Sequence, residues 1–368
     1  MTPNSNYGRV YNFSAGPAVL PVPVLEQVRD ELLCLPGVGS SVLEISHRSK
    51  AFDQILDQTL ADLRTLLQIP EGYSIAFLQG GSRLQFSMIP MNLLRGTDKT
   101  AEYIVTGTWG KSALAEAKKE GATKVLWDGK EGNYSSLPNI DELGSSADAA
   151  YVHLTSNETI QGVQFAGDPA LAAPVVCDCS SDFLSRPVDV SKYGLIYACA
   201  QKNAGPAGVT AVIIRDDLLA RGSDDLPGYL LYRNHVDGKS CYNTPPTFAI
   251  YVMGLVIKWL INDIGGLDKM AAANQAKAGL LYSLIDQYPT VFQGHAEKGV
   301  RSMMNVTFRL PSDELQAEFL AAAKAANCTD LKGHRSVGGI RASIYNAMPT
   351  AGVETLASVM RDFAAKHA

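Results

Sequence analysis

The sequence predicts an α/β protein, with a large domain built on a mostly parallel sheet and a smaller α/β domain after it. Short apolar runs, rich in β-branched and aromatic residues, alternate with helical patterns through most of the chain. Nearly continuous apolar strands separated by helices are typical of a parallel sheet covered on both faces. The sequence pattern changes near Gly265: the short apolar runs become rarer, and long helical patterns dominate. A chain of 368 residues is long enough for two domains.

The large domain is expected to contain seven strands, and its ligands are expected at the carboxyl ends of those strands. The strands are expected at 73–79, 101–107, 123–127, 149–155, 173–180, 193–200 and 208–215. Helical patterns at 82–94 and 109–121 follow the first two strands. The longest apolar run, 249–261, contains Lys258 and is too short to span a bilayer.

The smaller domain is expected to mix helices and strands. Its helices are expected near 267–287, 313–327 and 351–367, and its strands at 302–310 and near 328–333. The sequence therefore predicts a large domain over 15–264 and a smaller domain over 265–368. Residues 1–14 are expected to pack on the smaller domain.

Composition favours a cytoplasmic protein without nucleic-acid or membrane partners. The net charge of -5 disfavours nonspecific nucleic-acid binding, so an anionic ligand has to be held by local basic residues. The six cysteines are scattered without a C-x-x-C pair, as expected for free thiols in a reducing compartment. The N-terminal stretch has no apolar segment typical of a secretory signal. The six histidines lack metal-binding spacing, so no metal site is expected, and His153 is interpreted as a core residue.

A glycine-rich turn over 80–83 lies between the first strand and its helix and indicates an anion site. Glycines let the backbone approach a ligand, and the free N–H groups and dipole of a helix start attract phosphate. The turn lacks the G-x-x-x-x-G-K-[ST] pattern of a P-loop. On this evidence alone, a tight turn without a ligand is an equal alternative.

The strand at 173–180 carries a charged residue, Asp178, at its end. Cys177 and Cys179 point to one face of the strand and Asp178 to the other. An unpaired buried carboxylate is costly, so Asp178 needs a partner. That partner is either a salt bridge or helix cap or, in a functional site, the protonated nitrogen of a heterocycle.

A lysine, Lys202, follows the strand at 193–200 in the stretch "AQKNAGPAG". Gly205, Pro206 and Gly208 predict a sharp turn that holds Lys202 toward the strand ends. The lysine is either an ordinary exposed loop residue or an amine that, once partly desolvated, loses its proton and forms an imine.

An anion-binding turn, a strand-end aspartate and a strand-end lysine together meet the requirements of pyridoxal phosphate. The phosphate needs the helix start, the pyridine nitrogen needs a carboxylate, and the aldehyde needs an amine. Trp109 follows another strand in "VTGTWG", and it either stacks on the cofactor ring or packs in the core.

Motifs spread over nearly the whole chain match those of one enzyme family. They are "YNFSAGPAVLP", "SVLEISHRSK", "GGSRLQF", "SNETIQGV", "AQKNAGPAG", "YNTPPTFAIY", "GLVIKWL" and "LKGHRSVGGIRASIYNAMP". With these motifs the sequence closely resembles the phosphoserine aminotransferases, pyridoxal-phosphate enzymes of the class V family. The resemblance implies the aspartate-aminotransferase fold, known as fold type I.

The resemblance implies a role for each cofactor residue. Lys202 is implied to form the imine, Asp178 to pair with the pyridine nitrogen and Trp109 to stack on the ring. The other implied cofactor residues are Thr159 near the ring hydroxyl and, at the phosphate, Ser82, Arg83, Gln201, Asn243 and Thr244. The last two are implied to come from a second subunit, which makes the protein a homodimer with shared active sites.

The resemblance also implies the substrates, L-glutamate and 3-phosphohydroxypyruvate, which react to O-phospho-L-serine and 2-oxoglutarate in serine biosynthesis. Substrates with anionic groups at both ends require arginines with forked donors. Arg341 is implied to hold the α-carboxylate. The residues implied to hold the distal phosphate or γ-carboxylate are Arg83, His334, Arg335 and, from a partner subunit, His47 and Arg48. For any single arginine, a surface salt bridge is the alternative.

Related reactions remain open at this point. Members of the family often also convert 3-hydroxy-2-oxo-4-phosphonooxybutanoate to 4-phosphohydroxy-L-threonine, in pyridoxine biosynthesis. The phosphate turn departs from many members, because Ser82 and Leu84 stand where glycine is more frequent. The alternatives are another fold-type-I aminotransferase or lyase that acts on a different amino acid, and a binding module or structural homodimer without catalysis.

Overall fold

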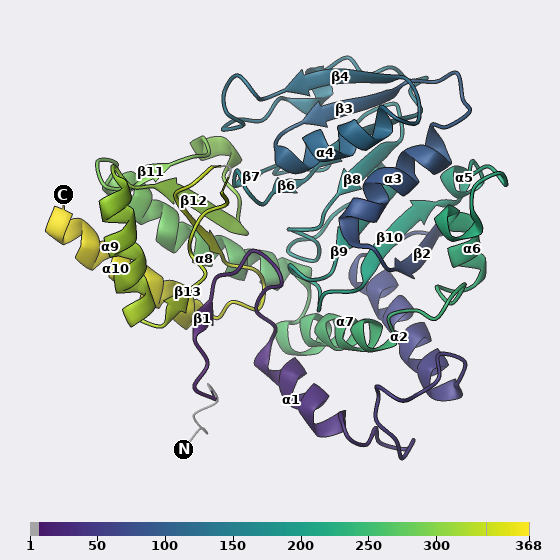
Figure 1. Ribbon diagram of the computed structural model, residues 1–368, viewed down its shortest axis with the longest axis horizontal. Helices are drawn as coiled ribbons and strands as arrows, with labels where there is room; N and C mark the ends of the chain where they lie inside the picture. The colour runs from purple at the N-terminus through teal and green to yellow at the C-terminus, as the bar shows by residue number, and fades with distance from the viewer. Residues whose placement is uncertain (1–6, 336, 368) are drawn as a thin grey trace.

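The computed structural model describes residues 7–335 and 337–367, which form a larger and a smaller part (Figure 1). The larger part is built on a seven-stranded sheet with the strand order β2-β10-β9-β8-β5-β3-β4. The strands are β2 (Tyr73–Leu78), β3 (Ala101–Val105), β4 (Thr123–Asp128), β5 (Tyr151–Thr155), β8 (Val175–Asp178), β9 (Leu195–Cys199) and β10 (Thr210–Arg215). β10 runs antiparallel to both of its neighbours, whereas the other pairs in this sheet are parallel. The expected mostly parallel sheet is confirmed.

Helices cover both faces of this sheet, as nearly continuous apolar strands require. The helices of one face are α2 (Lys50–Leu66) and α7 (Thr247–Trp259), and those of the other are α3 (Gly81–Leu93), α4 (Thr108–Ala117) and α6 (Tyr232–Asp237). Successive residues of one strand enter different cores: Cys177 packs with α2 and α7, and Val176 packs with α3 and α4.

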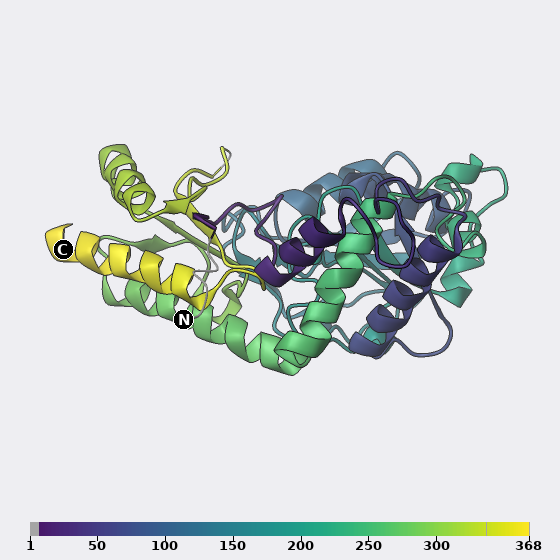
Figure 2. The same cartoon turned by 90° about the horizontal axis from the view of Figure 1, so that it is seen from below.

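The smaller part combines three helices with an antiparallel sheet of the order β11-β12-β14. Its elements are α8 (Leu267–Gln287), α9 (Asp313–Ala325), α10 (Thr350–His367), β11 (Gln293–Gly294), β12 (Asn305–Arg309) and β14 (Ile340–Ser343). Phe292, Phe308 and Phe319 pack edge to face in its core. Figures 1 and 2 show α9 and α10 at the end of the molecule that lies away from the large sheet.

The N-terminal segment packs on the smaller part. β1 (Tyr11–Asn12) pairs in parallel with β13 (Cys328–Thr329), and Phe13 is fully buried in the core of the smaller part. We therefore keep the domain division at residue 265 as a proposal, with residues 7–14 assigned to the smaller domain. Residues 1–6, which belong to the same prediction, lie outside the described residues.

Several elements, among them the long helices α2 and α7, are missing from the sequence-based prediction. The others are β1, β6 (Asn157–Glu158), β7 (Val163–Gln164), β11, β14, α1 (Val22–Glu31), α5 (Asp216–Leu219), α6, η1 (Ile140–Glu142), η2 (Val190–Lys192), η3 (Gly228–Leu230), η4 (Leu260–Ile264) and η5 (Lys298–Val300). Strands of two to four residues are too short to show the alternation on which a sequence-based prediction relies.

One stretch of the described chain, Thr247–Ile264, is long and apolar enough to cross a membrane. Of this stretch, 56% is buried inside the protein, and its helix α7 packs on α2. We interpret it as a core helix, since core helices meet the same length and composition test.

Candidate active site

A cavity of about 470 Å³ opens at the carboxyl ends of β8 and β9, where a parallel sheet presents its ligands. Residues from the N-terminal segment, the sheet and the smaller part all line it. They are Ala15, Gly16, Gly80, Gly81, Ser82, Arg83, Trp109, Thr159, Ile160, Asp178, Ser180, Cys199, Gln201, Lys202, His334 and Arg341.

The cavity is bounded on one side by the first turn of α3. Gly80 has a φ of +88°, and a Cβ there would lie 2.6 Å from the side chain of Leu84, so both the backbone and the space require glycine. The N-cap position offers no side-chain acceptor to the first N–H groups of the helix. The hydroxyl of Ser82 lies 2.6 Å from that of Ser180, which joins this turn to the end of β8.

Lys202 extends into the cavity from the turn after β9. Its Nζ donates a hydrogen bond of 2.6 Å to Oγ1 of Thr159 and lies 5.3 Å from the ring centre of Trp109. Gly16 packs so closely that a Cβ there would lie 3.2 Å from Cγ of Lys202. The lysine is therefore held among the sheet, α4 and the N-terminal segment.

Asp178 lies at the end of β8, opposite Tyr197 in the parallel register with β9. Its side chain is almost completely buried, and its Oδ1 accepts a hydrogen bond of 2.9 Å from the N–H of Ser180. Burial raises the pKa of Asp178, and the positive charge of Lys202 opposes that rise. The carboxylate is thus positioned to hold a cationic group inside the cavity.

Cationic groups gather at the cavity. The guanidinium carbon of Arg83 lies 5.5 Å from the ring centre of Trp109, on a ring that Lys202 also approaches. Burial lowers the pKa of Arg341, which projects from β14 into the cavity. Burial and the charges of Arg341 and Arg335 lower the pKa of His334. A cavity with this excess of positive charge is suited to anions.

A family model, described as aminotransferase class-V, matches residues 10–356. The chain belongs to the class-V aminotransferases. It is 56% identical to the phosphoserine aminotransferase of Rhodopirellula baltica, over 98% of this chain and 96% of that one. It is 52% identical to the phosphoserine aminotransferase of Geobacillus kaustophilus, over 98% of this chain and 99% of that one. The resemblance to phosphoserine aminotransferases is thereby confirmed.

Solved structures of phosphoserine aminotransferases also resemble this class-V aminotransferase. The phosphoserine aminotransferase from Bacillus circulans subsp. alkalophilus superposes with a TM-score of 0.95 at 46% identity, covering 98% of this chain and 99% of that one. The phosphoserine aminotransferase of Trichomonas vaginalis with bound pyridoxal phosphate superposes with a TM-score of 0.90 at 41% identity, covering 96% of this chain and all of that one. The expected fold type I and the expected pyridoxal-phosphate-dependent transaminase are both confirmed.

The residues of the cavity fit pyridoxal phosphate. The volume of the cavity, about 470 Å³, lies within the range of cofactor sites. The uncapped start of α3 matches a phosphate, and the buried carboxylate of Asp178 matches a protonated ring nitrogen. The amine of Lys202 lies in the same cavity, beside the ring of Trp109. The cavity of this class-V aminotransferase therefore contains groups suited to bind the phosphate, the ring and the aldehyde of the cofactor.

Five residues from the sequence-based site do not line this cavity. They are His47, Arg48, Asn243, Thr244 and Arg335. Asn243 donates instead to Oε1 of Gln79, while Arg48, Thr244 and Arg335 are exposed. The sequence-based prediction assigns all of them except Arg335 to the site of a partner subunit, so their position in a single chain does not test their roles.

The sequence-based site lacks several residues that line the cavity. Ser180 and Cys199 sit at the ends of β8 and β9, and Ala15 and Gly16 come from the N-terminal segment. The strand-end position is a signal that could have identified Ser180. For Gly16 the signal is the "SAGP" stretch, because a glycine before a proline marks an unusual backbone turn.

Proposed function

We propose that this class-V aminotransferase transfers the amino group of L-glutamate to 3-phosphohydroxypyruvate, giving O-phospho-L-serine and 2-oxoglutarate. The observation that carries the proposal is the pair of guanidinium groups at the cavity, Arg83 and Arg341, with the imidazole of His334 beside them. Both substrates are anionic at each end, and such molecules need two separate cationic contacts. The names of the relatives support the same reaction and its place in serine biosynthesis.

Pyridoxal phosphate supplies an aldehyde for the amino group and a ring that withdraws electrons from the reacting carbon. Within that chemistry, we assign the α-proton to Nζ of Lys202, which would take it from the α-carbon of the substrate and return it to the cofactor carbon that carried the aldehyde. Asp178 would keep the ring nitrogen of the bound cofactor protonated, because a buried carboxylate stabilises a cation bonded to it. Trp109 would pack against the cofactor ring, and Thr159 holds Nζ of Lys202 in place.

The cationic groups divide between the two ends of the substrate in this proposal. Arg341 binds the α-carboxylate, which places the α-carbon near Lys202. Arg83 and His334, which line the cavity, bind the distal phosphate or γ-carboxylate, and Arg335, the exposed residue after His334, is proposed to assist them. A forked guanidinium fixes both the position and the orientation of a carboxylate, which a lysine cannot do.

We also propose a cytoplasmic homodimer with shared active sites. The proposal rests on the family resemblance, which implies that His47, Arg48, Asn243 and Thr244 reach the partner's cavity; none of the four lines the cavity of its own chain. The scattered cysteines without a C-x-x-C pair support the cytoplasmic location. Light scattering of the purified protein measures the oligomer, and a monomer with full activity contradicts the shared sites.

The experiment that tests the reaction compares 3-phosphohydroxypyruvate with hydroxypyruvate, which lacks the phosphate, at fixed L-glutamate. We expect kcat/KM for the phosphorylated acid to be larger by about 100-fold, since a buried charge contact is lost in the other. Arg341→Ala should lower kcat/KM for glutamate by a similar factor of about 100. Arg361→Ala, on the exposed face of α10, is the matched control. Equal rates with both acids contradict the phosphorylated substrate and favour another aminotransferase or a lyase.

The longer acceptor 3-hydroxy-2-oxo-4-phosphonooxybutanoate carries the same two anionic ends. We propose that it is a second substrate, converted to 4-phosphohydroxy-L-threonine, which places the enzyme in pyridoxine biosynthesis as well. The same assay with this acid tests it. A rate no greater than with hydroxypyruvate removes this second reaction and leaves the first intact.

A further inference from the structure

A second buried carboxylate, Glu158, lies behind the candidate site and does not line the cavity. It belongs to the short strand β6, its side chain is 0% exposed, and it directly precedes Thr159, which bonds Lys202. A fully buried carboxylate costs free energy, so its retention in the fold needs a reason.

The contacts of Glu158 are with the start of a helix from another part of the chain. Oε2 accepts a hydrogen bond of 3.2 Å from the N–H of Trp109, and Oε1 accepts one of 3.0 Å from the N–H of Gly110. These are the second and third residues of α4, the positions that an N-cap side chain normally serves. The N-cap residue itself is Gly107, which has no side chain to offer.

The backbone of α4 is shaped around this carboxylate. A Cβ on Gly107 would lie 2.5 Å from Cδ of Glu158, so the glycine leaves the space that the carboxylate fills. Burial raises the pKa of Glu158 to about 7, while its two backbone hydrogen bonds and Lys202 favour the charged form. The helix dipole also favours a negative charge at this point.

We propose that Glu158 is a positioning residue, which fixes the start of α4 so that the ring of Trp109 faces Lys202. The proposal rests on the proposed role of Trp109 and Lys202 in holding the cofactor. Glu158 positions Trp109 by binding its backbone N–H at the start of α4, and the next residue, Thr159, accepts a hydrogen bond from Nζ of Lys202. Two consecutive residues therefore position both the lysine and the ring beside it. The alternative is that Glu158 only stabilises the helix.

A double-mutant cycle in the full-length protein separates these two roles. The variants are Glu158→Gln, Trp109→Ala and the two combined, and the readouts are the dissociation constant of pyridoxal phosphate and the near-ultraviolet circular dichroism of tryptophan. Gln keeps the shape of the side chain but turns an N–H₂ group toward one of the two backbone donors. Glu158→Asp keeps the charge and displaces it, and it serves as the second variant if the first does not fold.

The matched control is Glu102→Gln, in β3. Glu102 is also a buried carboxylate, and it pairs with Lys124 and accepts from the N–H of Ser146, outside the residues that line the cavity. The Glu102→Gln variant therefore measures the effect of neutralising a buried carboxylate that does not contact α4.

We expect Glu158→Gln to weaken pyridoxal phosphate binding by about tenfold, and by less than about twofold when Trp109 is already alanine. The tryptophan signal should change with Glu158→Gln and stay constant with Glu102→Gln. Equal losses with and without Trp109, or a fall in stability with an unchanged tryptophan signal, overturn the proposal. If the wild-type protein binds the cofactor but does not use the phosphorylated acid, the proposed function fails while this cycle still decides the role of Glu158.

Discussion

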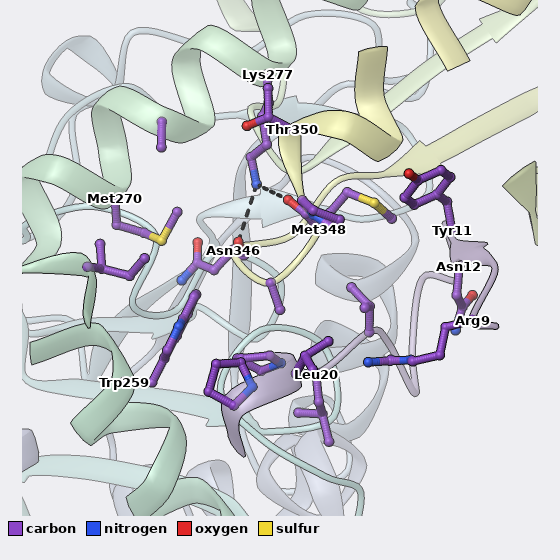
Figure 3. Close-up of a pocket in the computed structure, with 18 of the residues that line it drawn as sticks. Arg9, Tyr11, Asn12, Leu20, Trp259, Met270, Lys277, Asn346, Met348 and Thr350 are labelled. Atoms are coloured by element: carbon purple, nitrogen blue, oxygen red, sulfur yellow. Dashed lines mark hydrogen bonds between the residues drawn. The ribbon is translucent and has the colours of Figure 1, made fainter. Parts of the chain in front are cut away.

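Lys202 and Lys277 are both shielded from solvent, but their amines have different hydrogen-bond partners. Lys202 lies in the cavity at the strand ends, whereas Lys277 on α8 lines a second cavity of about 370 Å³ between the N-terminal segment and the smaller part. In Figure 3, Lys277 points its amine at the turn of Asn346 and Met348, with Trp259 and Met270 on another side of the cavity. Both side chains are partly or fully withdrawn from water.

Lys277 is surrounded by backbone acceptors. Its Nζ lies within hydrogen-bond distance, 2.8–3.4 Å, of four carbonyl oxygens, those of Ile344, Tyr345, Asn346 and Met348, which share its N–H groups. These carbonyls belong to the chain that follows β14, and that of Tyr345 also accepts from the N–H of Met348. The amine therefore holds a turn in place, and little capacity remains for a ligand.

Lys202 has a single side-chain acceptor, the hydroxyl of Thr159, and faces a cavity. Two buried carboxylates, Asp178 and Glu158, lie close enough for the charge of Lys202 to lower their pKa values against the effect of burial. The comparison teaches that burial alone does not make a lysine reactive. An amine with one exchangeable partner beside an open cavity can form a bond with a ligand, whereas an amine bound by four carbonyls is structural.

The two surroundings are connected. The N–H of Asn346, in the turn held by Lys277, donates to Oδ1 of Asn203, the residue after Lys202. Asn274 on α8 donates to Asn346 as well. The structural lysine therefore supports the chain that carries the proposed reactive one.

The largest effect is expected for Lys202→Ala. We expect kcat to fall by at least about 10⁴-fold, because both the bond to the cofactor and the proton transfer depend on this amine. Stopped-flow or steady-state rates with glutamate measure it, and the midpoint of urea unfolding should stay within experimental error. Substantial activity in Lys202→Ala would remove the assignment of the reactive lysine.

The next effect is expected for Asp178→Asn, which keeps the shape of the side chain and removes its charge. We expect kcat to fall by about 10²- to 10³-fold, because the amide no longer stabilises a protonated ring nitrogen. The fall in kcat should exceed the rise in KM for glutamate. Asp141→Asn, at an exposed position, is the control, and equal rates for wild type and Asp178→Asn contradict the pairing.

Lys277→Met tests the structural half of the comparison. We expect the free energy of unfolding to fall by about 3 kcal/mol, since four carbonyls lose a shared donor. Lys269→Met, on the exposed side of the same helix, should change it by less than about 0.5 kcal/mol. Urea unfolding measures both variants. A Lys277→Met protein as stable as the wild type would show that the turn does not need the amine.

The smallest expected effect is the pH dependence of stability that the titration of Lys277 produces, and it tests directly whether the amine is neutral in the folded protein. Burial lowers the pKa of Lys277 to about 7, below the value of about 10.4 for an unfolded lysine. Between these values the unfolded chain binds a proton that the folded chain has lost, so the free energy of unfolding rises with pH, by up to about 1.4 kcal/mol per unit.

The measurement is the difference in unfolding free energy between the wild type and Lys277→Met, followed from about pH 6 to about pH 9. The difference should rise with pH, because the variant lacks the titrating group. A constant difference would mean that the four carbonyls keep Lys277 protonated throughout this range.

The sequence was sufficient for the large sheet and for the centre of the site. The seven strands appear where their apolar runs predict them, and Ser82, Arg83, Trp109, Thr159, Asp178, Gln201 and Lys202 all line one cavity. Strand ends and glycine turns are local signals, so Asp178, Lys202 and the turn at Ser82 can be identified without knowing the fold, whereas Thr159 and Gln201 were implied only by the family resemblance.

Other features were decided by contacts between distant parts of the chain. The direction of β10, the four-residue strand β14 that carries Arg341, and the cap that Glu158 provides to α4 leave no local pattern. The same holds for the acceptors of Lys277, which come from residues 67 to 71 positions away. By itself the sequence determined the seven strands of the large sheet and the residue types at their ends. Only the tertiary structure decided that Lys202 keeps one side-chain acceptor among the described residues while Lys277 meets four carbonyl oxygens, because desolvation and hydrogen-bond partners depend on segments that meet only in the folded chain.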